Sequence, residues 1–276
     1  MSIKKKITVI MPVYKETPQQ LRQAIDSILG QTIKNFEFLI VLDNPRNRTA
    51  QQIIKEYEKK DKRIRMNINK RNLGLPASLN KAIQLANGEL IARMDADDIA
   101  LPDRLAKELA CLKKTGANIV SSNVVYIDEK GKEIKRSAFT QADVQNLRKT
   151  LLTKDPHPIV HPTVLGKKKV FLQNPYDETF RNSQDFELWL RLAAKGVRFA
   201  LVQKPLLKLR VPRTTYEKRV EKNRRYAQYV LRALKKNFPY YKQQYSFYKK
   251  FLCTLFRITL LTLPKKILVP LIKLKK

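Results

Sequence analysis

Short apolar runs alternate with longer segments of helical periodicity through the first half of the chain. The runs predict buried strands over residues 7–11, 36–42, 64–68 and 118–127, and one that leads from Leu90 into Asp95. Apolar residues spaced three and four positions apart predict helices over about 18–29, 50–60, 75–86 and 102–114. Strands that alternate with helices pair in a mostly parallel sheet, because each helix carries the chain back across the sheet. We therefore expect an α/β fold with a Rossmann-like sheet and helices on both faces.

The first strand and the first helix carry boundary signals of their own. Pro12 is expected to end the strand, since proline lacks the N–H group that a ladder needs. Thr17, Pro18 and Gln20 have the spacing of a capping box with proline at the first helical position, which predicts that a helix begins there.

The second half of the chain is less regular. Helices are expected over about 141–152 and 184–194, and edge strands over 199–202 and 206–211. Beyond Thr214 the sequence is helical in pattern and basic. We expect a folded domain over residues 1–213, with halves at 1–127 and 128–213, and a basic helical tail over 214–276.

Positive charge dominates the composition. The 276 residues include 57 Lys and Arg against 24 Asp and Glu, a formal net charge of +33, which implies an anionic partner. From Lys222 to the last residue there is no acidic side chain. The two cysteines are far apart and lack metal-ligand spacing, so a reducing cytosol is expected. The first residues lack the apolar stretch of a signal peptide.

Three carboxylates follow the strand that begins at Leu90. Alternation along a strand would place Asp95 and Asp97 on one face, with Ala96 pointing away. Neighbouring carboxylates repel each other unless a cation lies between them, and oxygen ligands favour Mg²⁺ or Mn²⁺. Because open α/β sheets bind ligands at the carboxyl ends of their strands, the motif predicts a metal-diphosphate site. The alternative is that these acids, Asp98 above all, cap the next helix.

Other strand ends carry further candidates. Asp43 follows the second strand and can accept the N3–H of a uracil ring, or serve as a turn residue. Asn72 precedes a helix and can shape a pocket wall or cap that helix. The residues that can frame a nucleobase or ribose after the first strand, or form a simple turn, are Pro12, Val13, Tyr14 and Glu16.

Two side chains of the second half can take part in chemistry. Asp185 lies in the first turn of a predicted helix, where the helix dipole stabilises the ionised carboxylate. It can act as a general base, or simply start the helix. His161 can approach a metal or a phosphate, whereas a structural role is favoured for His157.

In their order along the chain, these residues resemble the markers of glycosyltransferase family 2. The resemblance spans about residues 7–211 and is closest to bacterial enzymes that build surface polysaccharide or lipooligosaccharide. The markers are Pro12-Val13-Tyr14, Asp43, Asn72-Leu73-Gly74, Asn80, Gly88-Glu89, Asp95-Ala96-Asp97-Asp98, Arg104, His161-Pro162-Thr163, Gln184-Asp185 and Leu188-Trp189-Leu190-Arg191.

The resemblance implies a GT-A fold and an inverting, metal-dependent sugar transfer. The expected donor is a UDP-sugar, bound by residues 1–127, and the expected acceptor is a saccharide or a lipid-linked molecule, bound by 128–213. Asp43 would bind uracil, and Asp95 would contact the ribose or the metal. Asp97 would hold Mn²⁺ or Mg²⁺ with the diphosphate, and Asp185 would be the base. The other residues that would line the nucleotide-sugar site are Pro12, Val13, Tyr14, Glu16, Asn72 and Ala96.

The tail contains the apolar segment Phe251–Leu263, which is shorter than the ~20 residues of a membrane-spanning helix. Lysine pairs at 249–250 and 265–266 flank it, and a second apolar run covers 267–272. This combination favours peripheral binding to the anionic inner face of the cytoplasmic membrane. The alternative is that the segment packs on the catalytic domain or on another subunit.

Two other classes of function fit parts of the sequence. A nucleic-acid-binding protein would explain the charge, but no specific nucleic-acid motif occurs. A sugar nucleotidyltransferase would use the same acidic residues with a metal. No Gly-rich dinucleotide fingerprint or P-loop occurs, which argues against a dinucleotide-dependent enzyme and against a P-loop NTPase.

Overall fold

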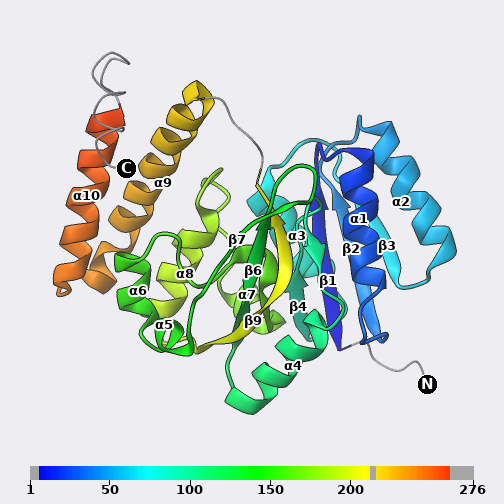
Figure 1. Cartoon of the computed structure of the whole chain (residues 1–276), viewed down its shortest axis with the longest axis horizontal. Coiled ribbons are helices and arrows are strands. Elements are labelled where there is room, and N and C mark those ends of the chain that lie inside the picture. Colours follow the sequence, from blue (N-terminus) through cyan, green and yellow to red (C-terminus); the bar gives the residue numbers. More distant parts are fainter. Residues whose placement is uncertain (1–5, 212–215, 262–276) are drawn as a thin grey trace.

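A nine-stranded sheet forms the centre of the molecule, with helices on both faces (Figure 1). The computed structural model describes residues 6–211 and 216–261. The strands are β1 (Ile7–Val13), β2 (Phe36–Leu42), β3 (Ile64–Ile68), β4 (Leu90–Arg93), β5 (Ile99–Ala100), β6 (Ile119–Ile127), β7 (Glu133–Arg136), β8 (Leu165–Lys167) and β9 (Phe199–Arg210). The α-helices are α1 (Pro18–Leu29), α2 (Arg48–Lys60), α3 (Leu75–Leu85), α4 (Arg104–Thr115), α5 (Gln141–Gln145), α6 (Leu147–Thr153), α7 (Lys168–Gln173), α8 (Gln184–Ala194), α9 (Tyr216–Tyr241) and α10 (Tyr245–Leu261).

The strand order is β3-β2-β1-β4-β8-β6-β9-β5, and β7 pairs with β6. Strands β1, β2, β3 and β4 form a parallel unit, as their alternation with helices predicts. Strand β8 runs antiparallel to both β4 and β6 and so links this unit to the second half of the sheet. Asp43 therefore follows a strand with parallel neighbours on both sides, whereas Asp95 follows β4, where the parallel unit meets the antiparallel strand β8.

Successive residues of the strands pack into two hydrophobic cores on opposite faces of the sheet. In β2, Phe38 and Ile40 share a core with helices α1 and α2, whereas Leu39 and Val41 share one with α3 and α8. This alternation follows from the two-residue period of a strand. Because both faces are covered, the central strands are continuous apolar runs.

The capping box at the start of α1 is confirmed. Thr17 Oγ1 accepts from the Gln20 backbone N–H (3.3 Å), and the Gln20 side chain accepts from the Thr17 N–H (3.0 Å). The expected end of β1 at Pro12 is wrong, since the strand continues to Val13. Strand β4 pairs with β1 only as far as Ile10, so the missing N–H of Pro12 costs no bond on that side.

Two elements of the second half differ from the sequence prediction. The single helix expected over 141–152 is two short helices, α5 and α6, which meet at Asn146. The two expected edge strands are one strand, β9, which lies between β6 and β5. Its register on β6 shifts next to Pro205, which cannot donate to a ladder, so the bulge absorbs the proline without ending the strand.

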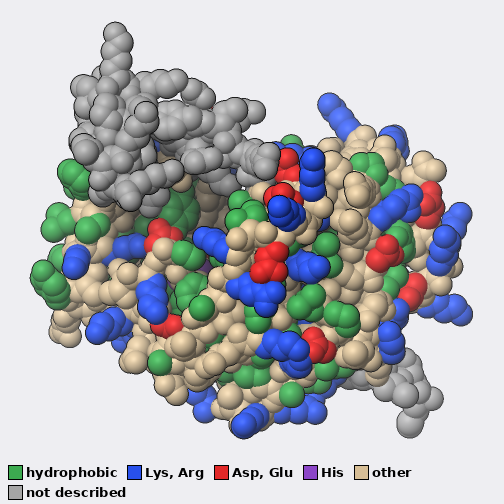
Figure 2. All heavy atoms as spheres, viewed as in Figure 1, with side chains coloured by type: hydrophobic (Ala, Val, Ile, Leu, Met, Phe, Trp, Pro, Cys, Tyr) green, Lys and Arg blue, Asp and Glu red, His purple; other side chains and the backbone are tan. Residues whose placement is uncertain are grey.

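Helices α9 and α10 form an antiparallel pair at the end of the molecule opposite α2 (Figure 1). Leu234 of α9 and Phe247 of α10 are buried in the same core as α8, so this pair packs on the domain. Among the described side chains of α10, the aliphatic or phenyl groups of Leu252, Leu255 and Phe256 are exposed, as are the rings of Tyr245 and Tyr248. Figure 2 shows hydrophobic side chains at this edge, while Lys and Arg are spread over the face shown.

None of the described helices combines the length and apolar content needed to cross a membrane. The predicted boundary at residues 213 and 214, the lysine pair 265–266 and the apolar run 267–272 lie outside the described residues.

Candidate active site

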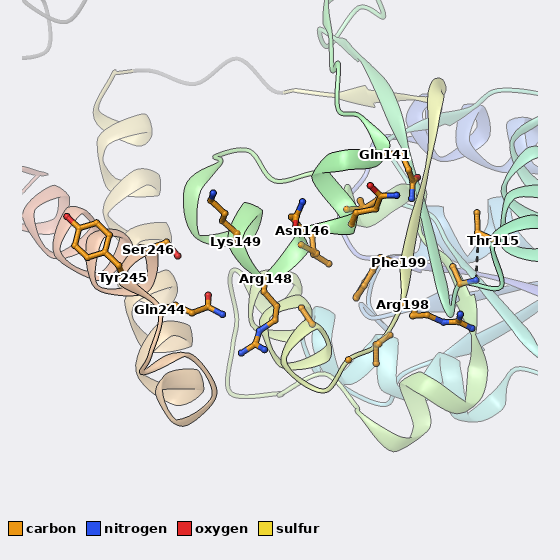
Figure 3. A pocket seen from close by; sticks show the side chains of 17 residues that line it. Thr115, Gln141, Asn146, Arg148, Lys149, Arg198, Phe199, Gln244, Tyr245 and Ser246 are labelled. Carbon is orange, nitrogen blue, oxygen red and sulfur yellow. Dashed lines mark hydrogen bonds between the residues drawn. The ribbon is translucent and has the colours of Figure 1, made fainter.

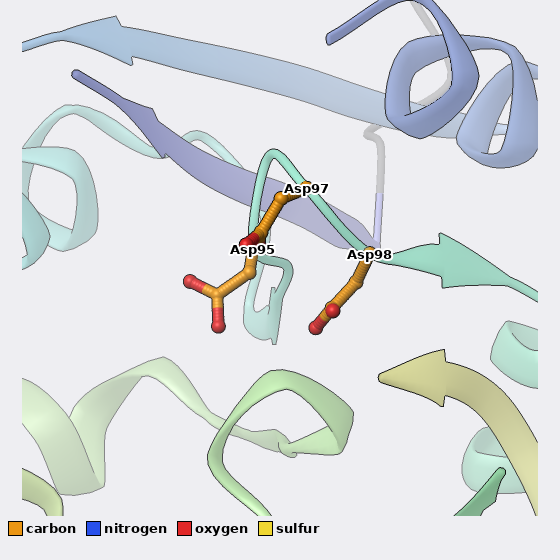
Figure 4. Close-up of side chains that lie close together, drawn as sticks. All are labelled: Asp95, Asp97 and Asp98. Atoms are coloured by element: carbon orange, nitrogen blue, oxygen red, sulfur yellow. The ribbon is translucent and has the colours of Figure 1, made fainter. Parts of the chain in front are cut away.

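Three carboxylates converge on the loop between β4 and β5. One ligand oxygen from each of Asp95, Asp97 and Asp98 lies within 4.8 Å of the others. Figure 4 shows them on one tight loop, with the carboxylates of Asp95 and Asp98 on the same side of it. The prediction that strand alternation places Asp95 and Asp97 on one face is wrong, because β4 ends at Arg93 and the acids lie on a turn. The turn brings Asp98 into the group instead of leaving it as a helix cap; α4 starts later, after Asp103.

Distant arginines hold this turn in place. Arg210, the last residue of β9, donates its backbone N–H to Asp98 Oδ1 (2.8 Å) and its Nε–H to the Asp97 carbonyl oxygen (2.8 Å). Arg104 of α4 donates to the carbonyl oxygen of Arg93 (2.6 Å), and Arg93 in turn pairs with the Asp95 carboxylate. The acidic loop is thus fixed from three elements, which keeps its carboxylates grouped despite their mutual repulsion.

The surroundings of the acidic loop raise the pKa of two of its carboxylates. Burial, and then the charges of Asp95 and Glu16, raise the pKa of Asp97 to about 6. Burial, and then the charges of Asp95 and Asp97, raise the pKa of Asp98 well above its usual value. Asp98 Oδ2 is buried and has no hydrogen-bond partner among the described residues. An orphaned carboxylate oxygen in an acid-rich, oxygen-only set fits a hard divalent cation such as Mg²⁺ or Mn²⁺.

A cavity of about 350 Å³ lies beside this loop, at the carboxyl ends of β1 and β2. Of the residues predicted to bind the nucleotide sugar, Ala96 and Asp97 do not line it: Ala96 is buried in the core shared with α1. The lining residues are Pro12, Val13, Tyr14, Glu16, Asp43, Asn72, Gly74, Leu75, Ser78, Asp95 and Arg181. The residues after the first strand and Asp95 of the acidic loop therefore face one space, the donor cavity.

Asp43 organises one wall of the donor cavity. Its Oδ1 accepts from Asn69 Nδ2 and from the Leu73 N–H, both at 2.8 Å, and its Oδ2 accepts from the Gly74 N–H at 2.9 Å. Gly74 has φ +87°, a conformation that favours glycine and turns its N–H toward this carboxylate. Asp43 thus anchors the loop before α3, and Oδ2 retains acceptor capacity for a ligand.

A second cavity, of about 510 Å³, adjoins the donor cavity and is called here the acceptor-side cavity. Asp95 lines both cavities, and Asp185 lines the second. Asp185 lies in the first turn of α8, where its Oδ1 accepts from the Phe186 N–H (2.9 Å). The structure therefore places the predicted base in the space next to the acidic loop.

His161 also lines the acceptor-side cavity but lies outside the carboxylate group. Its Nε2 hydrogen bonds with the Tyr176 hydroxyl (2.8 Å), and its ring contacts Trp189. Burial and the neighbouring Arg93 hold the pKa of His161 well below its usual range, so the ring is neutral. His157 packs on Phe186, in line with the structural role expected for it.

A larger cavity, of about 1090 Å³, lies elsewhere, between α5, α6 and the start of α10 (Figure 3). Its lining contains Arg148, Lys149 and Arg198 but no carboxylate, histidine or cysteine. Because this lining lacks the carboxylates that the two smaller cavities bring together, those two cavities are the candidate active site.

Several site residues had no separate signal in the sequence. Arg181 is a basic residue in the lining of the donor cavity, and Tyr226 of α9 lines the acceptor-side cavity. Arg181 lies in the segment before α8, and Tyr226 lies in the segment for which a basic helical tail is predicted. Only the basic character of Arg181, four residues before Asp185, could have suggested a contact with an anionic donor.

The family model of glycosyl transferase family 2 matches residues 8–178. An uncharacterized glycosyltransferase of Methanocaldococcus jannaschii, MJ1057, is 39% identical over 90% of this chain and 86% of that protein. The O-antigen biosynthesis glycosyltransferase WbnJ of Escherichia coli is 32% identical over 77% of this chain and 82% of that protein. An uncharacterized glycosyltransferase of Rickettsia felis is 35% identical over 75% of this chain, which spans only 33% of that longer protein.

Solved structures share the architecture. The mannosyltransferase PcManGT of Pyrobaculum calidifontis, in complex with GDP-Man and Mn²⁺, aligns with a TM-score of 0.64 over 94% of this chain and 73% of that chain, at 18% identity. S. aureus TarS 1–349 in complex with UDP-GlcNAc aligns with a TM-score of 0.62 over 95% of this chain and 82% of that chain, at 16% identity. The architecture is the GT-A fold. Because the family model covers more than half of its residues, this chain belongs to glycosyl transferase family 2.

Proposed function

We propose that this glycosyltransferase moves a sugar from a nucleotide donor, most simply a UDP-sugar, to a saccharide or lipid-linked acceptor with inversion of the anomeric centre. The observation that carries this proposal is the position of Asp95, which lines both the donor cavity and the acceptor-side cavity. A donor bound beside Asp95 would present its anomeric carbon at the junction of the two spaces. The acceptor hydroxyl would then approach from the side of Asp185.

The acidic loop is the proposed metal site. Asp95, Asp97 and Asp98 would hold Mn²⁺ or Mg²⁺ through carboxylate oxygens. When bound, the ion would stabilise the negative charge that develops on the departing diphosphate. Arg181, in the lining of the donor cavity, would add a fixed positive charge near the same phosphates.

Asp185 is the proposed general base. Only its Oδ1 is engaged by a described residue, so Oδ2 can accept the proton of an acceptor hydroxyl. As that proton transfers, the hydroxyl oxygen forms a bond to the anomeric carbon. The bond from this carbon to the phosphate oxygen breaks on the opposite face, and its electron pair leaves with the nucleotide diphosphate. A single displacement of this kind inverts the centre without a covalent sugar–enzyme intermediate.

The nucleotide is proposed to be UDP. The Asp43 carboxylate accepts three hydrogen bonds, from Asn69, Leu73 and Gly74, which leaves Oδ2 with room for one further donor. The N3–H of uracil is a single donor, whereas guanine presents two donors on the same edge. The related structures hold either UDP-GlcNAc or GDP-Man, so nucleotide release from UDP-sugars and from GDP-sugars tests which nucleotide binds.

The cellular setting is proposed to be cell-surface polysaccharide or lipooligosaccharide synthesis at the inner face of the cytoplasmic membrane. Named relatives support the polysaccharide part: WbnJ acts in O-antigen biosynthesis and AmsE of Erwinia amylovora in amylovoran biosynthesis. The exposed apolar face of α10 and the absence of acidic residues after Lys222 support contact with anionic lipid.

The proposal is tested by incubating the protein with UDP- and GDP-sugars in the presence of Mn²⁺ or Mg²⁺ and measuring nucleotide release. We expect slow, metal-dependent release of UDP, since water can replace the acceptor. Release of pyrophosphate would instead indicate a nucleotidyltransferase. A salt-sensitive gel shift with nucleic acid and no UDP binding would indicate the nucleic-acid-binding alternative.

A further inference from the structure

Helix α9 contributes a side chain to the candidate active site, although its sequence belongs to the basic tail. We propose that Tyr226 of α9 is a specificity-determining residue that binds a sugar ring of the acceptor. The proposal rests on the proposed function, since it assigns the acceptor-side cavity to a saccharide. The sugar occupies the acceptor-side cavity with its apolar face against the Tyr226 ring and its reacting hydroxyl toward Asp185.

The lining of the acceptor-side cavity suits a saccharide. Tyr226 shares this cavity with Asp95 and Asp185, the two carboxylates on either side of the proposed transfer. A pyranose has an apolar C–H face and a rim of hydroxyl groups, so it needs a flat ring and polar partners together. Tyr226 and Tyr126 both line the cavity, and Tyr226 supplies the ring on its α9 side. The residues that precede α8, Asn182 and Ser183, supply polar groups.

Hydrogen bonds and an ion pair connect helix α9 to the segment that leads into Asp185. Arg232 donates to the Thr179 carbonyl oxygen (3.1 Å) and to Thr179 Oγ1 (2.7 Å), and Lys236 pairs with Asp177 (2.8 Å). The Arg232 guanidinium also lies 4.7 Å from the centre of the Phe180 ring. These contacts tie α9 to residues 177–180, just before α8, so the positions of Tyr226 and Asp185 are set by one packed unit.

A second anchor fixes the far end of α9. The Tyr241 hydroxyl is buried and donates to the Leu190 carbonyl oxygen of α8 (2.9 Å). Near the cavity, the Tyr226 hydroxyl reaches Asp155 Oδ1 at 3.5 Å, which is a weak bond. The Tyr226 ring also packs against the core that contains α8, and the contacts of Arg232, Lys236 and Tyr241 keep α9 attached to α8 and to the segment before it when that ring is removed.

The experiment compares four variants with the wild type by saturation-transfer difference NMR. The probes are UDP, Mg²⁺ and a fixed set of methyl glycosides of glucose, galactose, mannose, N-acetylglucosamine and rhamnose. Tyr226→Ala removes the ring, Tyr226→Leu keeps apolar bulk without a flat ring, and Tyr226→Phe keeps the ring without the hydroxyl. Tyr240→Ala is the matched control, because Tyr240 is half-exposed on the same helix and lines neither cavity of the site.

We expect at least one glycoside to bind the wild type, Tyr226→Phe and Tyr240→Ala. Binding to Tyr226→Ala and Tyr226→Leu should be weaker by roughly fivefold or more, the scale of one lost aromatic contact. Unfolding temperatures of the variants separate lost binding from lost fold. The inference is overturned if no glycoside binds the wild type, or if the Ala and Leu variants bind as the wild type does.

Failure of this inference is distinguishable from failure of the proposed function. Nucleotide release by the wild type in the absence of glycosides tests only the donor reaction. If the wild type releases no nucleotide from any UDP- or GDP-sugar, the proposed function is wrong whatever Tyr226 binds. If it releases nucleotide but the Tyr226 variants bind glycosides normally, only the assignment of Tyr226 is wrong.

Discussion

Arg93, buried at the end of β4, donates from its guanidinium to the carboxylate of Asp95 two residues further along the chain. Asp95 is therefore oriented from inside the protein, whereas Asp98 keeps a buried oxygen without a partner. Asp95, whose carboxylate is fixed in this way, lines both cavities.

Replacement of Asp97 by alanine should abolish metal-dependent nucleotide release from the donor. The change removes one of the three grouped carboxylates, and loss of one charge-stabilising group at a reacting centre commonly slows a reaction by about 100-fold or more. The measurement is UDP release at saturating Mn²⁺. Asp103→Ala is the control, since Asp103 pairs with Lys107 outside the group. Wild-type release by Asp97→Ala would remove Asp97 from the metal site.

Metal binding should weaken in mildly acidic solution. Burial and neighbouring acids raise the pKa of Asp97 to about 6, so the folded, metal-free protein holds this proton more tightly than the unfolded chain. The protonated Asp97 carboxyl therefore contributes to the free energy of unfolding at low pH, and this contribution is lost as the pH rises from about 4 to about 6. A metal needs the ionised carboxylate, so Mn²⁺ should raise the unfolding temperature more at about pH 7.5 than at about pH 5. Equal shifts at both pH values, measured by scanning fluorimetry, would contradict this prediction.

Asp185→Asn should retain UDP binding and lose sugar transfer. Asparagine keeps the shape of the side chain but cannot accept a proton, so the acceptor hydroxyl would attack without general-base assistance. We expect transfer to slow by roughly 100-fold or more, the usual contribution of a positioned base. UDP affinity by calorimetry and transfer rate are measured on the same preparation. Normal turnover of the variant would exclude Asp185 as the base.

Gly88→Ala should destabilise the fold. A Cβ atom at this position would lie 2.6 Å from the Thr8 backbone nitrogen and 2.7 Å from the Ile7 carbonyl carbon, so backbone would have to move. Overpacking of this kind costs about 1–3 kcal/mol in the free energy of unfolding. Denaturant unfolding measures it, with Gly30→Ala as the control, whose nearest contact is 3.2 Å. An unchanged midpoint for Gly88→Ala would show that β1 and β4 tolerate separation.

Replacing Leu252, Leu255 and Phe256 by serine should reduce binding to anionic vesicles. These side chains are exposed on α10, on a segment without acidic residues, so they suit insertion between lipid head groups. The measurement is flotation with phosphatidylglycerol vesicles. Leu172→Ser, an exposed leucine on α7, is the matched control. Equal flotation of the triple variant and the control would refute membrane contact through α10.

Local patterns along the chain predicted much of the fold and the donor side of the site. The parallel strands, the capping box at Thr17 and the strand-end positions of Asp43 and Asp95 depend on neighbours in sequence, so residue spacing reveals them. The grouping of Asp98 with Asp95 depends on Arg210, which donates its backbone N–H to Asp98 Oδ1 from 112 positions away and its Nε–H to the Asp97 carbonyl oxygen. No local pattern could indicate that contact.

The amino-acid sequence alone established an α/β glycosyltransferase pattern, an acidic metal-type motif and a base candidate at the start of a helix. Tertiary structure decided which of these residues share a space, that His161 bonds to Tyr176 outside the acid group, and that Tyr226 of the basic tail enters the acceptor side. Periodicity determines on which face of a helix or strand a residue lies, whereas packing between distant segments determines which other residues that face contacts.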